Sequence, residues 1–114
     1  MSQVRQLVLT ATVSTGAILI CSLAGRIKQL SNGQSITVKM PEDNCYNLII
    51  VCQGAQSSTA SLAARAVHGS YQAVLCNMDD TPSSTAFPAL TATIPPGAFA
   101  GMEASKISVS KKAT

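Results

Sequence analysis

The four cysteines, Cys21, Cys45, Cys52 and Cys76, are the residues of this sequence whose side chains could most readily do chemistry. Cys21, Cys52 and Cys76 each follow three aliphatic residues, which is typical of cysteine that serves as a small buried hydrophobe. Cys45 follows Asn44 at the edge of a polar loop, so we expect it to carry the most exposed thiol. Disulfides are the alternative, because four cysteines allow three internal pairings. Buried thiols and disulfides therefore both stay open.

A metal site is not expected. The sequence has no Cys-X-X-Cys pair, and Cys45 and Cys52 are seven positions apart, whereas structural zinc sites use closely spaced pairs. The acidic doublet Asp79-Asp80 offers too few oxygen ligands for a tight Ca²⁺ site and is expected to form a solvated turn. We therefore predict no metal and no other cofactor.

An enzyme is not expected either. His68 is the only histidine, so a Ser-His-Asp triad would need it together with Ser70 and with Asp79 or Asp80. The sequence lacks the Gly-X-Ser-X-Gly motif, and no spacing selects one cysteine as a Cys-His nucleophile. There is no glycine-rich phosphate loop, and four scattered aromatic residues are too few to stack bases or sugars.

The elements that must position these residues follow a two-residue period, which is typical of β-strands. The first such segment, Leu7–Val13, places Leu7, Leu9, Ala11 and Val13 on one face. Further strands are predicted at residues 17–21, 34–40, 46–52, 71–76, 90–94 and 105–110. Turn residues separate these segments. The sequence thus predicts a single all-β domain over residues 1–114, an antiparallel β-sandwich or small barrel of seven to eight short strands.

Two segments carry more specific local predictions. The pair Asn32-Gly33 predicts that Arg26–Met40 is a β-hairpin closed by a two-residue type I′ turn. Residues 58–67 fit either a short helix capped by a serine or threonine, or a strand with small apolar residues alternating. We favour the strand, because a β-rich neighbourhood would recruit it.

Composition bears on the kind of partner. Charged residues make up 11% of the chain, against about 25% in typical domains, and the net charge of +3 is too small to indicate nucleic-acid binding. The acidic residues lie in Glu42-Asp43, Asp79-Asp80 and Glu103, whereas the first 39 residues carry only basic ones. Few charges mean weak self-repulsion, which favours a subunit that lies against other subunits. A neutral monomer coated with serine and threonine would have the same composition.

No export signal is recognised. Residues 1–13 alternate instead of forming a continuous apolar stretch, and the longest apolar run, Ala17–Cys21, is far shorter than the roughly 20 residues of a membrane helix. We therefore expect a chain made and used without Sec export, in a reducing compartment that disfavours obligatory disulfides. A particle released from the cell could oxidise later.

The segments Leu7–Val13, Gln34–Met40 and Leu90–Ile94, with Ala98-Phe99-Ala100 near the end, resemble those of small phage head-decoration or cement proteins. This resemblance covers the whole chain and implies a non-enzymatic structural subunit of a virus or phage particle. Its partners would be copies of itself, as a homo-oligomer, and a major capsid or other virion protein. The aliphatic segments exceed what a small monomer's core needs, so we expect some in subunit contacts, together with edge strands and termini.

The alternative function is a binding or adhesion module. Its recognition loops would be residues 41–45, 53–59 and 77–88, at the ends of a β-sandwich.

Overall fold

The computed structural model describes residues 5–23, 25–40, 44–67 and 71–111. Ten strands lie in these ranges. They are β1 (Arg5–Val13), β2 (Ile18–Leu23), β3 (Arg26–Leu30), β4 (Ser35–Met40), β5 (Cys45–Gln53), β6 (Thr59–Ala66), β7 (Tyr71–Cys76), β8 (Pro82–Ala86), β9 (Leu90–Thr93) and β10 (Ala100–Lys111).

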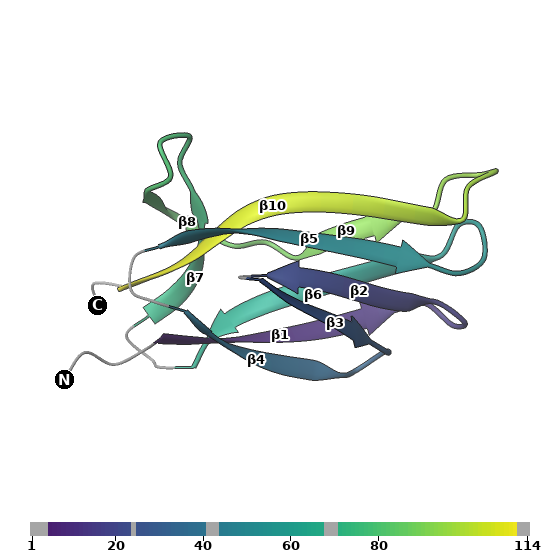
Figure 1. Cartoon of the computed structure of the whole chain (residues 1–114), viewed down its shortest axis with the longest axis horizontal. Coiled ribbons are helices and arrows are strands. Elements are labelled where there is room, and N and C mark those ends of the chain that lie inside the picture. The colour runs from purple at the N-terminus through teal and green to yellow at the C-terminus, as the bar shows by residue number, and fades with distance from the viewer. Residues whose placement is uncertain (1–4, 24, 41–43, 68–70, 112–114) are drawn as a thin grey trace.

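The strands form two layers (Figure 1). One is a four-stranded sheet in the order β4-β1-β6-β9, and the other is a six-stranded sheet in the order β3-β2-β5-β10-β7-β8. All strand pairs are antiparallel. The all-β fold and its sandwich architecture are therefore confirmed, with more strands than the seven to eight predicted.

Strand β8 lies within residues 77–88, which the alternative of a binding module treats as a recognition loop. It pairs with β7 through Val74↔Ala86 and Cys76↔Pro82, with an irregularity between them. A proline has no N–H to donate, so it fits the first residue of an edge strand. The polar composition concealed this strand, because an edge strand needs no continuous apolar face.

The core lies between the two sheets and follows the pleat. The predicted strand at Leu7–Val13 is confirmed, and its face with Leu7, Leu9, Ala11 and Val13 is the inward one, since all four are buried. Alternate residues of β2 and β5 face them from the other sheet, and these are Leu19, Cys21, Leu23, Leu48, Ile50 and Cys52. Burying each large aliphatic side chain contributes about 1.5–3 kcal/mol. This pattern fixes which side of each strand is left to face outward.

The predicted Arg26–Met40 hairpin is wrong. β3 pairs with β2 in the six-stranded sheet, whereas β4 pairs with β1 in the four-stranded sheet. The turn at Asn32-Gly33 carries the chain from one sheet to the other. The Gln34 N–H donates to the Ser31 carbonyl at 3.1 Å, and Gly33 has a φ of 82°. Among the described residues Asn32 has no positive φ, so the two positive φ values of a type I′ turn are not met.

Residues 59–66 form a strand, and the alternative of a short helix near 58–67 is wrong. β6 pairs with β1 over seven register positions and with β9 on its other side. Its alternating pattern buries Ala60 and Leu62 completely. A helix would leave the inner edge of β1 unpaired, so the sheet environment decides between two locally similar preferences.

Candidate functional site

The outer face of the six-stranded sheet is aliphatic. Two register rows cross it: Ile20, Val51 and Met102 lie side by side, and so do Ser22, Ile49 and Ala104. On β2 and β5 the neighbours of these residues along the strand are buried in the core, which aims the side chains outward, and the register places Met102 and Ala104 on the same side. We call this surface the aliphatic face, and its members are Ile18, Ile20, Ile27, Ile49, Val51, Met102 and Ala104.

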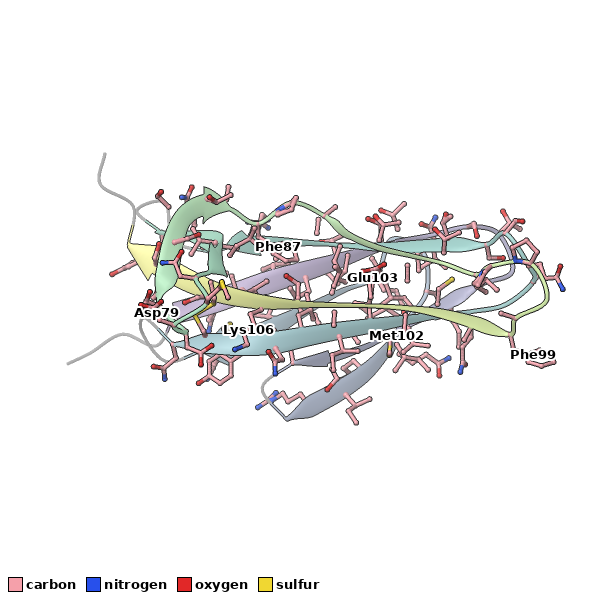
Figure 2. All side chains as sticks on the ribbon, turned by 90° about the horizontal axis from the view of Figure 1, so that it is seen from above. Asp79, Phe87, Phe99, Met102, Glu103 and Lys106 are labelled. Carbon is pink, nitrogen blue, oxygen red and sulfur yellow. A yellow bond between two sulfur atoms is a disulfide. The ribbon has the colours of Figure 1, made fainter. Side chains whose placement is uncertain are left out.

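Two members of the aliphatic face stand out by exposure. The Ile27 side chain is 71% exposed and that of Met102 is 68% exposed, although both are large and apolar. Phe99, in the loop before β10, is 90% exposed at the far tip of the molecule (Figure 2). Exposed apolar side chains gathered on one sheet face mark a contact surface far better than scattered ones.

The outer face of the four-stranded sheet has a different chemistry. Its register rows are rich in hydroxyl groups, with Thr10 beside Ser35, and Ser61 beside Thr91. The hydroxyls of each pair hydrogen-bond across the strands, at 2.9 Å and 3.2 Å. The sandwich thus has a hydrophilic outer face on the four-stranded sheet and an apolar outer face on the six-stranded sheet.

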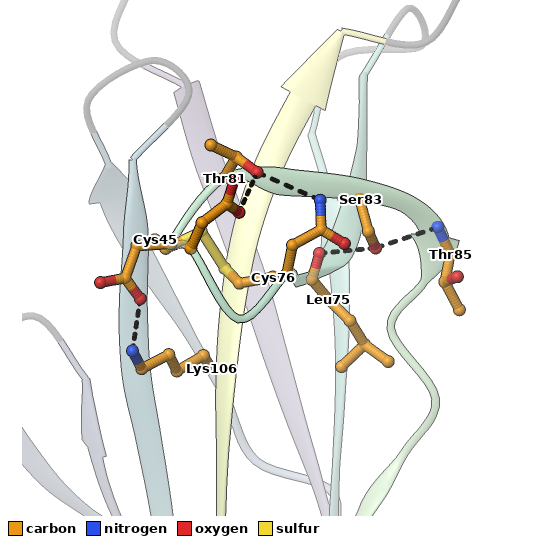
Figure 3. The surroundings of a disulfide bond; sticks show 10 residues. Cys45, Leu75, Cys76, Thr81, Ser83, Thr85 and Lys106 are labelled. Carbon is orange, nitrogen blue, oxygen red and sulfur yellow. Dashed lines mark hydrogen bonds and ion pairs between the residues drawn. A yellow bond between two sulfur atoms is a disulfide. The ribbon is translucent and has the colours of Figure 1, made fainter.

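A tight turn between β7 and β8 lies beside Cys45 at the start of β5 and beside Lys106 of β10 (Figure 3). The Asn77 N–H donates to the Thr81 carbonyl at 2.7 Å, and the Asp80 N–H donates to the Asn77 carbonyl at 3.1 Å. The Lys106 ammonium forms an ion pair with the Asp80 carboxylate. Lys106 lies on β10 opposite Asn47 and shares the outer side of the sheet, so this ion pair holds the turn there.

A disulfide between Cys45 and Cys76 also pins this turn, with Cα atoms 6.1 Å apart. Cys45 begins β5 and Cys76 ends β7, and β10 lies between these two strands. The bond therefore spans the central strand. A shallow hollow beside it is lined by Asn44, Cys45, Tyr46, Asn47, Asp80 and Lys106.

The structure divides the four cysteines into two kinds. Cys45, expected to carry the most exposed thiol, is bonded to Cys76 instead, because the ends of β5 and β7 converge over β10. Cys21 and Cys52 are buried, unbonded thiols on adjacent strands. Burial raises the pKa of the Cys21 thiol, partly offset by a backbone hydrogen bond at Lys28, and burial also raises the pKa of Cys52. A protonated thiol is a poor nucleophile and metal ligand, so neither is suited to catalysis.

The cysteine pairing predicts a simple labelling pattern. Iodoacetamide should leave all four cysteines unmodified in the native protein without reductant, since two are bonded and two are buried thiols. Unfolding in denaturant alone should expose Cys21 and Cys52 to labelling, and Cys45 and Cys76 should need a reductant as well. Peptide mass spectrometry measures each site, and rapid native labelling of Cys45 would contradict the assignment.

The remaining residues considered for a catalytic triad or a cation site are His68, Ser70, Asp79 and Asp80. His68 and Ser70 lie outside the described residues. Asp79 and Asp80 lie in the exposed β7–β8 turn, as expected, where the Thr81 hydroxyl donates to Asp79 at 2.6 Å and lowers the pKa of that carboxyl. In the part of the chain that the structure describes, no three histidine, cysteine or acidic side chains cluster as metal ligands.

Comparison with known proteins gives no relative. No protein-family model, curated protein or solved structure matches this chain. Among the described residues no helix has the length and apolar character needed to span a membrane.

One feature of the sequence indicates the aliphatic face. Residues 46–52 are apolar at almost every position, whereas a strand with one side in water alternates. The individual members could not be chosen, because their assignment needs the register of β2, β5 and β10.

Proposed function

We propose that this protein is a non-enzymatic structural subunit of a virus or phage particle, acting through protein–protein contacts. The aliphatic face carries this proposal. A hydroxyl-rich face opposite an aliphatic one suits a subunit whose one side meets water and whose other side meets protein. The low charge of the chain adds support, because it keeps repulsion between closely packed neighbours small.

The shape of the aliphatic face fits a contact on a shell better than recognition of a small molecule. It is an open sheet surface spread over β3, β2, β5 and β10, and the ion pair of Lys106 and Asp80 lies at its β7–β8 end. Small-molecule sites are concave and enclose most of their ligand. Interfaces between proteins instead have an apolar centre and a polar rim, and here polar side chains such as Gln29 and Asn47 form that rim.

Association with particles tests the proposal. The occupancy of the Met102→Lys chain in purified particles should be at least tenfold lower than that of the unchanged chain. The reason is that the variant would bury a charge in the contact. Thr37→Lys, which places the same charge on the exposed outer face of the four-stranded sheet, is the matched control. Quantitative mass spectrometry of gradient-purified particles measures occupancy. Equal retention of both variants, or no chain in the particles, would contradict the proposal.

One observation favours the alternative of a recognition module. The β7–β8 turn, in one of the predicted recognition loops, is held by a disulfide and an ion pair, and rigid loops suit ligand binding. A chain that stays out of particles and loses binding to a defined ligand on Asp80→Ala would favour this function.

A further inference from the structure

Strand β3 projects from one margin of the six-stranded sheet. It is the last strand on that side and pairs with β2 alone within the described residues. Its burial pattern shows that Arg26, Ile27, Lys28 and Gln29 are all exposed, whereas Leu30 is buried. Both faces of β3 are thus open over four residues, and its outer edge offers unpaired backbone groups.

Strand β10 has a second open edge. Its residues from Ala100 to Ser108 pair with β5, whereas β7 pairs on the other side only from Ile107 to Lys111. The reason is that β7 ends at Cys76, where the chain turns back into β8. In the described structure the first seven residues of β10, Ala100 to Lys106, therefore pair with a strand on one side only, while β9 of the other sheet approaches Gly101 from the core side.

The two edges run in compatible directions. β3, β2, β5 and β10 are successive antiparallel neighbours, so β3 runs opposite to β10. A second copy placed beside the first in the same orientation would present its β3 antiparallel to β10. That is the arrangement of every other strand pair in this sheet.

The side chains of the two edges are also complementary. Arg26 and Lys28 lie opposite inward-facing residues of β2 and so share the inner side of the sheet, and Glu103 shares that side on β10 because it lies opposite Ile50. Ile27 lies on the outer side, as do Met102 and Ala104. Figure 2 shows Glu103 on one side of β10 and Met102 on the other. Matched edges would place cation beside anion and apolar beside apolar.

We propose that β3 of one copy adds to the open edge of β10 of a second copy, joining their six-stranded sheets. The inference rests on the proposed function and names a second copy of this chain as one partner. Three antiparallel registers keep all of β3 on the open edge, and only one of them also matches the inner and outer sides of the two sheets. In that register Lys28 lies opposite Glu103, and Ile27 lies opposite Ala104 of the other copy. The contact extends the aliphatic face across both copies.

This contact is heterologous, because each copy uses its β3 edge to bind one neighbour and its open β10 edge to bind another. Repetition produces a ring if the rotation closes and a filament if it does not. The right-handed twist of sheets, about 20–25° between neighbouring strands, supplies a rotation at every joint. Strand β8, the other end of the sheet, begins with Pro82 and pairs irregularly, which makes it a poor template for another chain.

Charge exchange tests the pairing in the purified full chain. Lys28→Glu and Glu103→Lys should each weaken self-association about tenfold, because each places like charges opposite one another. The double variant should recover most of the loss. Lys39→Glu, the same charge change on β4, is the matched control. Sedimentation velocity measures the association constants. Equal effects of Lys39→Glu and Lys28→Glu, or no recovery in the double variant, would overturn the proposal.

Directed crosslinking then separates this contact from a symmetric dimer. Chains carrying Ile27→Cys are mixed with chains carrying Ala104→Cys under mild oxidation. Disulfides should join the two kinds of chain at least tenfold more often than either kind to itself, and two Ile27→Cys chains joined to one another would overturn the proposal. A purified chain that stays monomeric at high concentration would also overturn it. Particle association of the Met102→Lys and Thr37→Lys variants would still decide the proposed function separately.

Discussion

The Cys45→Ser, Cys76→Ser double variant is expected to unfold with a free energy about 3–4 kcal/mol lower than the unchanged protein. The two cysteines are 31 positions apart, and a crosslink closing a loop of this length restricts the unfolded chain by about that amount. For a chain of 114 residues the loss corresponds to a Tm lower by roughly 12–17 °C. Thermal unfolding followed by circular dichroism, with and without a reductant, measures the change.

Two comparisons make the disulfide prediction specific. The unchanged protein in reductant should unfold close to the double variant, and adding reductant to the variant should change little, because Cys21 and Cys52 are thiols in both. The single variant Cys45→Ser should lose about as much as the double variant. A Tm that falls by less than about 4 °C, which corresponds to roughly 1 kcal/mol, would show that the bond contributes little to the native fold.

The sandwich could be predicted from the sequence because its core strands alternate strongly. Alternation groups Leu7, Leu9, Ala11 and Val13 on one face without reference to any partner strand, and in the structure all four are buried. The Asn32-Gly33 turn could not be assigned in the same way. The same pair can close a hairpin or pass the chain between sheets, and the partners of β3 and β4 decide which. These partners are set by packing over long sequence separations, which local patterns do not record.

The aliphatic face and the disulfide were hidden for the same reason. Met102 looks like an ordinary strand residue until its place opposite Val51 is known. Cys45 and Cys76 become partners only because β10, the last strand of the chain, inserts between β5 and β7 and brings their ends together. The sequence predicted most of the strands and the excess of aliphatic residues, whereas the surface they form depends on strand order.

Gly101 is the position in the core where a single methyl group should have the largest effect. It is buried on β10, and an added Cβ would lie 1.9 Å from the Thr93 carbonyl oxygen and 2.5 Å from the Thr93 carbonyl carbon. Both are backbone atoms of β9, so no side-chain rotation can relieve the clash. The close approach of β9 and β10 joins the two sheets along this margin of the sandwich.

Strand β9 has little freedom to retreat from such a methyl group. The Ile94 N–H donates to the Ser58 carbonyl and the Ile94 carbonyl accepts from the Ser57 N–H, both at 3.0 Å, while the Ile94 side chain is fully buried. Gly101→Ala is therefore expected to lower the free energy of unfolding by about 3 kcal/mol, at the upper end of typical overpacking costs. Urea unfolding at equilibrium measures this change.

Gly33→Ala is the matched control for Gly101→Ala. A Cβ at Gly33 would meet no atom within 4 Å, but its φ of 82° strains an L-residue, which costs about 1–2 kcal/mol. Gly33→Ala thus measures backbone strain alone, whereas Gly101→Ala measures steric overlap between the sheets. If Gly101→Ala lowers the free energy of unfolding no more than Gly33→Ala does, then β9 can move away from β10. The two sheets would then be less tightly packed at the margin that carries the open edge of β10.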